Sequence, residues 1–217
     1  MIIAIDGPSG AGKGTIARSV AERLGYGHID SGAMYRAVGW KALHDQIAFD
    51  DEEGLAHLAE RARIDVSSGA VTIDGHEVTR AIRTPEIDRA ATAVARLPKV
   101  RQALVARLRQ LGARGAIVME GRDIGTVVFP RADVKIYLDA APEERARRRA
   151  TDPAHSGGPP VVSEVAKMLT ARDEIDRTRK ASPLYAAGDA VVIDTTGKTI
   201  DEVVGAVLTV IGEKLGT

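Results

Sequence analysis

The sequence predicts an α/β fold with three layers, in which helices cover both faces of a central parallel sheet. Two observations support this prediction. Short apolar segments alternate with longer helix-permissive segments along most of the 217 residues, and each apolar segment is followed by a polar turn. The 44% hydrophobic and 28% charged fractions are ordinary for a globular chain, which disfavours disordered and collagen-like classes.

The first elements are expected to be a strand, a glycine-rich loop and a helix. Residues 2–5 form an apolar run, and residues 15–24 favour a helix that ends at a glycine. A second short strand is expected over residues 26–30. Ser31 follows that strand and is expected to be the N-cap of a helix that reaches about His44.

Three further strands and two further helices complete the expected core. Residues 116–119, 134–138 and 190–193 are short and apolar, as buried strands are. Helices are expected over residues 85–95 and 98–111, because each segment opens with a proline, which suits the first turn of a helix. Strands separated by helices favour a parallel sheet.

A small β-rich insertion interrupts this alternation. Residues 64–66 and 71–78 alternate apolar and polar side chains around an Asp-Gly turn, which is typical of a hairpin. We therefore expect an insertion over residues 63–92, within a core formed by residues 1–62 and 93–217.

Composition excludes several classes of function. Lys and Arg (30) balance Asp and Glu (30), so no net positive field would gather a nucleic acid. No apolar run approaches the ~18 residues of a membrane-spanning helix, and the first residues lack the basic region of a targeting signal, so we expect a cytoplasmic protein. The absence of cysteine and of a His-Glu-x-x-His pair means that catalysis must rest on other groups.

A phosphate-binding loop is predicted immediately after the first strand. The pattern Gly-x-x-x-x-Gly-Lys lies between a strand and a helix, where backbone amides and the helix N-terminus favour anions and Lys13 can reach the β- and γ-phosphates. Gly14 stands where the general motif has Ser or Thr, so Thr15 or Ser9 would have to supply a hydroxyl facing magnesium. A glycine-rich turn with a solvated lysine is the alternative. The residues expected to bind the nucleoside triphosphate are Gly7, Pro8, Ser9, Gly10, Ala11, Gly12, Lys13, Gly14 and Thr15.

Four motifs together resemble the bacterial cytidylate kinase family. They lie at residues 7–15, 30–36, 121–130 and 172–179. The resemblance implies a P-loop NTPase fold with a short lid at about residues 149–162. It also implies transfer of the γ-phosphoryl group of ATP to CMP or dCMP, with Mg2+ as cofactor, by a monomer whose partners are these small molecules. Such a reaction needs positioned cations more than a Cys or His base.

The resemblance assigns three arginines to the acceptor phosphate. Arg36, Arg122 and Arg179 match the family's phosphate-binding positions, and Ser31 and Tyr35 lie beside them. Three guanidinium forks on one dianion are chemically sensible. The alternative for each arginine alone is a surface residue or one member of an ion pair on a helix.

The family's base and sugar contacts fall on five further positions. Thr92, Arg101 and Asp123 match the cytosine-binding residues, and a carboxylate that accepts from the exocyclic amine predicts CMP over UMP. Thr92 and Arg101 could instead be ordinary polar residues of two helices. Arg172 and Asp176 match the ribose-binding residues, although their spacing equally suits a solvated ion pair.

The run of arginines at 145–149 resembles the family's lid. Arg148 and Arg149 are the expected catalytic residues, since an arginine that closes over the transferring group would neutralise charge in the transition state. Glu143 and Glu144 precede the run at helical spacing, so we expect at least two of these arginines to pair locally.

The ligands of the metal ion are left unassigned by the sequence. Glu120, Asp6 and Asp139 all end predicted strands and are rival candidates. Two other functions also stay open. One is a related small kinase that acts on AMP, UMP or shikimate; the other is a P-loop binding module that grips a nucleotide without transferring phosphate.

Overall fold

The chain folds around a five-stranded parallel sheet. The computed structural model describes residues 1–66, 69–152 and 161–216. Every neighbouring pair of strands in this sheet runs parallel, as expected from the alternation of strands and helices. In spatial order the strands are β2 (Gly27–Asp30), β6 (Ile117–Gly121), β1 (Ile2–Asp6), β7 (Val134–Asp139) and β8 (Val191–Asp194).

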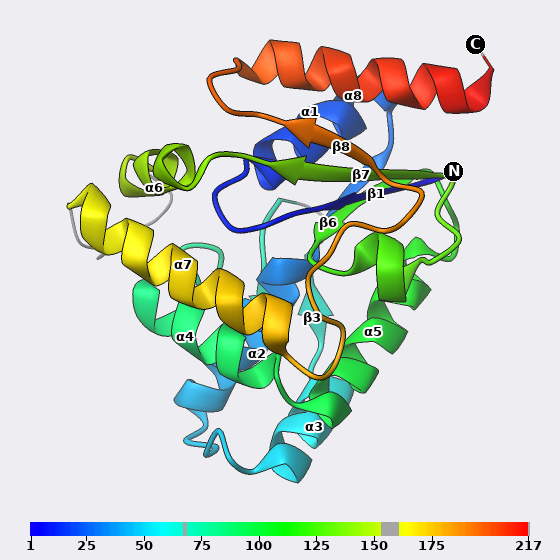
Figure 1. Cartoon of the computed structure of the whole chain (residues 1–217). Coiled ribbons are helices and arrows are strands. Elements are labelled where there is room, and N and C mark those ends of the chain that lie inside the picture. Colours follow the sequence, from blue (N-terminus) through cyan, green and yellow to red (C-terminus); the bar gives the residue numbers. More distant parts are fainter. Residues whose placement is uncertain (67–68, 153–160, 217) are drawn as a thin grey trace.

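Helices cover both faces of the sheet, which confirms the predicted three layers (Figure 1). Helices α1 (Lys13–Leu24) and α8 (Ile200–Leu215) lie on one face, where Ile3 and Ile5 of β1 are fully buried against them. Ala4, between these two residues, belongs to the core of the opposite face, as the alternation of side chains along a strand requires. None of the helices in the described ranges is long and apolar enough to cross a membrane.

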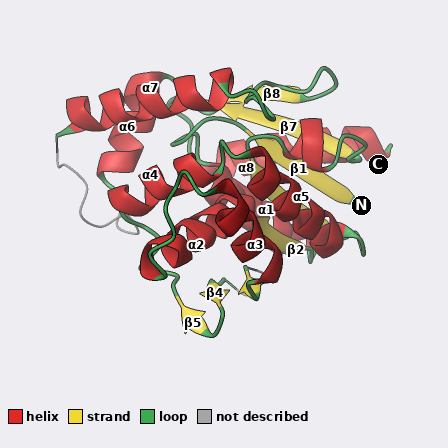
Figure 2. Cartoon of the chain, turned by 90° about the horizontal axis from the view of Figure 1, so that it is seen from below, coloured by secondary structure: helices red, strands yellow, loops and turns green. Residues whose placement is uncertain are grey.

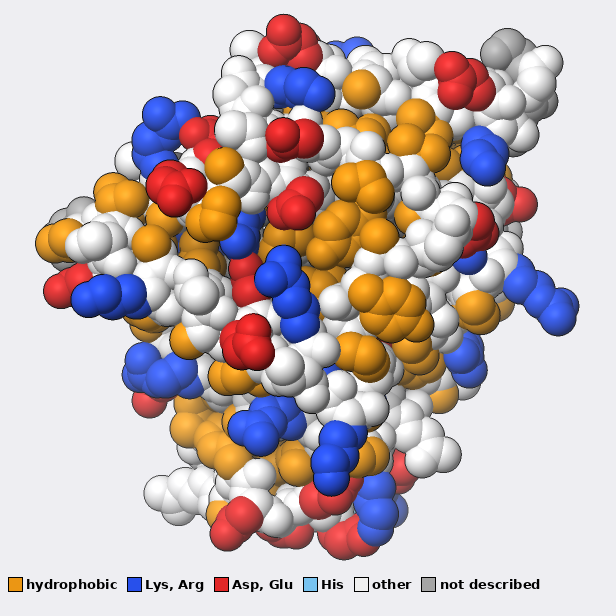
Figure 3. Space-filling model, in the orientation of Figure 1, with side chains coloured by type: hydrophobic (Ala, Val, Ile, Leu, Met, Phe, Trp, Pro, Cys, Tyr) orange, Lys and Arg blue, Asp and Glu red, His pale blue; other side chains and the backbone are white. Residues whose placement is uncertain are grey.

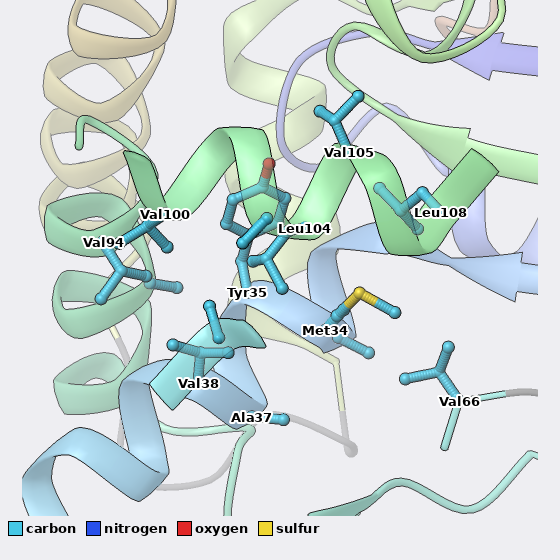
Figure 4. Close-up of a cluster of buried hydrophobic side chains, with 14 of the residues drawn as sticks. Met34, Tyr35, Ala37, Val38, Val66, Val94, Val100, Leu104, Val105 and Leu108 are labelled. Carbon is cyan, nitrogen blue, oxygen red and sulfur yellow. The ribbon is translucent and has the colours of Figure 1, made fainter. Parts of the chain in front are cut away.

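The second face of the sheet carries the larger apolar core. Figure 4 shows Met34 and Tyr35 of one helix in a cluster with Leu104 of another, far along the chain. This core positions the helices that surround the candidate site. The remaining helices are α2 (Ser31–His44), α3 (Glu52–Arg61), α4 (Pro85–Val94), α5 (Pro98–Gly112), α6 (Pro142–Ala150) and α7 (Val162–Thr178).

A separate antiparallel sheet lies within the predicted insertion. Its strands are β3 (Ile64–Asp65), β4 (Thr72–Ile73) and β5 (His76–Glu77), and Figure 2 shows β4 and β5 at the periphery beyond α2 and α3. Asp74 and Gly75 form the turn between β4 and β5 with φ of 47° and 82°, the left-handed conformation that an Asp-Gly hairpin adopts. The predicted hairpin is thus confirmed. The division into core and insertion stays a prediction.

One local prediction is corrected by the structure, and one element was not predicted. Asp30, not Ser31, is the N-cap of α2, because the Asp30 carboxylate accepts a hydrogen bond from the Ala33 amide (2.9 Å) and Ser31 is already helical. No local pattern indicated η1 (Ile124–Val128), a single turn of π-helix after β6. The lid predicted at about residues 149–162 lies, over residues 153–160, outside the described residues.

Candidate active site

A cleft of about 840 Å³ opens beyond the carboxyl ends of β1, β2 and β6. This is where ligands bind in open α/β sheets. Its lining comes from the glycine-rich loop after β1, from α2, α4, α5 and α7, and from the segment after β6. Segments that are distant in sequence therefore meet around one cavity.

The glycine-rich loop has the backbone of a phosphate cradle. Gly7, Gly10 and Gly12 adopt φ of 148°, 80° and 87°, and a Cβ at Gly7 would lie 2.0 Å from the Leu138 carbonyl oxygen. Side chains are therefore excluded at this position, and the loop can turn its amides inward. Six of the nine predicted residues line the cleft, while Gly7, Pro8 and Ala11 are buried and are not among the described lining residues. The six are Ser9, Gly10, Gly12, Lys13, Gly14 and Thr15.

Lys13 is buried at the floor of the cleft. Its ammonium group donates to the Pro8 carbonyl oxygen (2.7 Å). Burial, followed by the charge of Arg122, lowers the pKa of Lys13 to about 7. A phosphate anion beside this ammonium group would favour its charged form and offset the cost of burying the charge. Lys13 is therefore suited to bind a polyphosphate.

The three arginines expected at the acceptor phosphate line the same cleft as Lys13. Arg36, Arg122 and Arg179 come from α2, from the end of β6 and from the residue after α7. Arg122 donates through Nε to Asp176 Oδ2 (3.1 Å), and Arg179 Nη1 lies 3.6 Å from Asp176 Oδ1. The cavity therefore has a cationic wall facing the phosphate loop.

The residues expected to read the base form a connected group. Arg101 pairs with Asp123, and both side chains are buried, with 4% and 7% exposed. The Arg101 guanidinium also lies over the Tyr35 ring, 5.4 Å from its centroid. Burial raises the pKa of Tyr35 to about 12, and its buried hydroxyl has no hydrogen-bond partner within the described residues. Thr92 lines the cleft nearby, where its hydroxyl donates to the backbone carbonyl of the preceding turn.

The π-turn η1 directly follows Asp123 and fixes the direction of its backbone. No sequence pattern predicted this turn. Both carboxylate oxygens of Asp6 accept backbone amides of this turn, from Ile124 (2.8 Å) and Gly125 (2.7 Å). Burial is the main cause that raises the pKa of Asp6 to about 6. Arg109 binds the other end of the turn through two backbone carbonyls, at 3.0 and 2.8 Å. Asp6, a candidate metal ligand by sequence, is therefore engaged by the backbone.

Arg172 and Asp176, the two residues expected at the sugar, each pair with a residue of another element. Arg172 pairs with Asp88 of α4 (3.0 Å), whereas Asp176 accepts from Arg122. Both line the cleft. The alternative of an isolated ion pair within α7 is therefore not the arrangement found.

The two expected catalytic arginines lie in different places. Arg149 lines the cleft and pairs with Asp88. Arg148 pairs with Glu144 (2.8 Å) and donates to the side chain and carbonyl of Thr195 (2.9 and 2.7 Å), and it is not among the described residues that line the cleft. Arg147 also pairs with Glu144, so local pairing of two of these arginines is confirmed.

The Glu120 carboxylate lies next to Gly14 of the phosphate loop. A Cβ at Gly14 would lie 2.9 Å from Glu120 Oε1. His28 Nε2 lies 3.7 Å from the same oxygen. Across the described ranges, no group of three or more His, Cys, Asp or Glu side chains is placed to hold a metal ion. Magnesium keeps several waters and is bound through phosphates and one or two protein oxygens, so a site with Glu120 as its carboxylate fits that ion.

Two charged residues around the cleft have contacts that the sequence did not indicate: Asp88, whose side chain is 13% exposed, and the buried Arg145. Asp88 meets three arginines, but in the sequence it is an ordinary acidic residue in the first turn of a helix. Arg145 donates to the Ser9 carbonyl (3.0 Å) and pairs with Asp173, so it joins the phosphate loop to α7. Neither role follows from local spacing, because both depend on contacts between distant segments.

Comparison with solved structures confirms the P-loop kinase fold. A shikimate kinase from Bacteroides thetaiotaomicron has a TM-score of 0.53 at 13% identity, over 97% of this chain and 98% of that chain. A gluconokinase from Sinorhizobium meliloti has a TM-score of 0.51 at 14% identity, over 97% and 91% of the two chains. At these identities the likeness concerns the fold alone.

Sequence comparison is more specific. A cytidylate kinase from Solibacter usitatus is 46% identical over 217 residues, covering 99% of this chain and 94% of the relative. Another from Desulforamulus reducens is 48% identical over 210 residues, covering 95% of each. The sequence model described as cytidylate kinase matches residues 3–213. The chain therefore belongs to the cytidylate kinase family.

Proposed function

We propose that this protein transfers the γ-phosphoryl group of ATP to CMP or dCMP, giving ADP and CDP or dCDP. The observation that carries the proposal is that Lys13 and the arginines at positions 36, 122 and 179 line one cleft. Two anions can be held there face to face, one by loop amides and Lys13 and the other by guanidinium forks. Positioned cations are what a loose, dissociative phosphoryl transfer needs.

The donor triphosphate would bind at the phosphate loop. Loop amides would hold the β- and γ-phosphates, and Lys13 would add a charge-assisted hydrogen bond. Magnesium, when bound with ATP, neutralises charge on the β- and γ-oxygens. Glu120 is the residue that we assign to hold a water of that ion, with the hydroxyls of Ser9 and Thr15 as further oxygen donors, because all three line the cleft.

The acceptor phosphate supplies its own nucleophile. A phosphate monoester oxygen is already ionised near neutral pH, so it attacks the γ-phosphorus without a general base, and the bond to the β-phosphate oxygen breaks to release ADP. Arg36, Arg122 and Arg179 would hold this oxygen in line, with Ser31 beside them. Arg149 of α6 would offset charge that develops on the transferring group, since it lines the cleft.

Specificity for cytosine would come from the group formed by Arg101, Asp123 and Thr92. Asp123 would accept from the exocyclic amine, and Arg101 would donate to the ring nitrogen or carbonyl. Uracil would present a carbonyl to the same carboxylate and be repelled. Arg172 and Asp176 would contact the sugar, and the preference between CMP and dCMP depends on them.

The surface supports a small-molecule enzyme rather than a nucleic-acid-binding protein. Acidic and basic side chains are intermixed on the face shown in Figure 3, as the zero net charge suggests. We propose that the protein is a cytoplasmic monomer that acts on free nucleotides.

A coupled assay of ADP release with ATP, magnesium and a panel of acceptors tests the proposal. The panel is CMP, dCMP, UMP, AMP and shikimate. We expect turnover with CMP and dCMP far above the others. Turnover with AMP, UMP or shikimate instead would assign a different kinase activity, and ATP hydrolysis indifferent to the acceptor would contradict the proposal.

A further inference from the structure

Asp88 of α4 is the point at which three arginines from other elements meet. Its Oδ1 lies 3.1 Å from Arg36 Nε and 3.0 Å from Arg172 Nη1, and Arg149 pairs with Oδ2. These partners lie on α2, α7 and α6, so none comes from the helix that carries Asp88. We call Arg36, Arg149 and Arg172 the arginine trio.

The geometry leaves the arginine trio able to bind a ligand. All three arginines line the cleft, whereas Asp88 is not one of the described residues that do so, and its side chain is 13% exposed. A guanidinium group has five N–H donors in a planar fork. Each described contact with Asp88 joins one nitrogen of an arginine to the carboxylate, and the other N–H groups of the three forks can bind phosphate oxygens in the cleft.

The Asp88 carboxylate compensates the positive charge of the arginine trio. Burial, together with the neighbouring arginines, lowers the pKa of Arg149 to about 10 and also lowers the pKa of Arg172, while Asp88 acts in the opposite direction on both. Three like charges gathered around one cavity repel each other before a phosphate arrives. A carboxylate between them offsets this repulsion and fixes their directions.

We propose that Asp88 is a positioning residue for phosphoryl transfer, which aligns the arginine trio on the acceptor phosphate and the transferring group. The proposal deepens the proposed function and rests on it. It explains why residues of α2, α6 and α7 converge although they are far apart in the sequence.

Loss of the Asp88 charge has two effects of opposite sign on anions. The positive potential in the cleft rises, so the attraction for a phosphate or sulfate ion is kept or increased. Alignment is lost at the same time, since the side-chain amide nitrogen that Asp88→Asn introduces is a donor and cannot accept from Arg149 as a carboxylate oxygen does. Misplacement on the ångström scale costs rate far more than it costs binding. The signature of a positioning role is therefore a lower kcat without weaker anion binding.

The test compares Asp88→Asn with Glu86→Gln. Glu86 is an exposed residue in the same first turn of α4, so its substitution removes the same charge from the helix N-terminus without touching the trio. We expect kcat with CMP to fall roughly 10- to 100-fold in Asp88→Asn. We expect inhibition by sulfate, competitive with CMP, to be as strong as in the wild type or stronger. Glu86→Gln should change neither quantity.

A double variant separates positioning from a structural role. If Asp88 acts through Arg149, Asp88→Asn should cost much less in an Arg149→Ala background than in the wild type. Full additivity of the two losses, or a kcat of Asp88→Asn equal to that of Glu86→Gln, would overturn the proposal. So would a loss of sulfate and ATP binding in step with kcat, which is the pattern of a damaged fold.

One measurement does not depend on turnover. The Nη2–H resonance of Arg149, assigned with Arg149→Lys, should be sharp and protected from exchange in the wild type and lost in Asp88→Asn, because Arg149 pairs with the oxygen that the amide nitrogen replaces. Persistence of that resonance in Asp88→Asn would contradict the positioning role. A wild type that fails to phosphorylate CMP while the resonance behaves as expected would refute the proposed function and leave the arrangement of the trio established.

Discussion

Replacement of Asp123 by asparagine is the sharpest test of the base-binding site. The substitution keeps the shape of the side chain and exchanges one carboxylate oxygen for an amide nitrogen, which donates where the oxygen accepted. Cytosine would lose an acceptor for its amine, and uracil would gain a donor for its carbonyl. Selectivity, rather than overall activity, is therefore the quantity that should change.

The expected magnitude follows from the buried position of Asp123. One good polar contact to a base edge is worth ~1–3 kcal/mol of discrimination. This corresponds to a fall of roughly 5- to 150-fold in the ratio of kcat/KM for CMP over UMP. The same change weakens the Arg101–Asp123 pair, whose side chains are 4% and 7% exposed. Breaking a buried pair can cost ~3–5 kcal/mol of unfolding free energy.

The assay is ADP release with CMP or UMP at saturating ATP, with Tm recorded for each variant. Arg101 and Asp123 act together in this interpretation, so Arg101→Lys, which keeps the charge but not the fork, is a useful second variant. A lower Tm with unchanged selectivity would mean that Asp123 is a structural partner of Arg101 and does not read the base.

Three further predictions concern the donor loop, the metal and a buried acid. Lys13→Ala should lower kcat severely and leave the calorimetric Kd for CMP almost unchanged, since Lys13 is placed at the donor loop; equal losses of both would indicate a failed fold. Chelation of magnesium by EDTA should abolish ATP turnover but not CMP binding, with activity restored by excess magnesium; activity that survives EDTA would exclude the metal. Burial raises the pKa of Asp6 from 3.8 to about 6 in the folded protein. Protonated Asp6 therefore stabilises the fold fully below pH 3.8, and this stabilisation is lost as the pH rises through about 6. Urea unfolding should show a decline of up to ~3 kcal/mol over this range that is absent in Asp6→Asn, and identical pH profiles would refute the assignment.

Local patterns were sufficient for most of the fold. The strand before the glycine loop, the hairpin turn at Asp74 and Gly75 and the proline-initiated helices all depend on a few adjacent residues, and the structure has them where they were predicted. The first residue of α2 was predicted wrongly by one position, because Asp30 and Ser31 are both good N-cap residues and the local sequence does not select between them.

In the candidate site, too, residues within local motifs could be predicted, and residues that act through long-range contacts could not. Lys13 and the loop could be predicted from spacing, and the three arginines from motif resemblance, since each lies within a motif. Asp88 and the π-turn after Asp123 could not, because their roles come from contacts across long stretches of sequence. The catalytic role of Arg148 stays a prediction from its motif, and its described contacts are with Glu144 and Thr195.

The glycine after Lys13 limits how the donor loop can change. The carboxylate of Glu120 occupies the space that a side chain at position 14 would need, with 2.9 Å between that oxygen and a would-be Cβ. Restoring the hydroxyl of the general loop pattern by Gly14→Ser would thus displace the Glu120 carboxylate, which is the far end of a flexible side chain and can turn aside. A change at position 14 would therefore act on the neighbouring acidic group and leave the backbone of the loop in place.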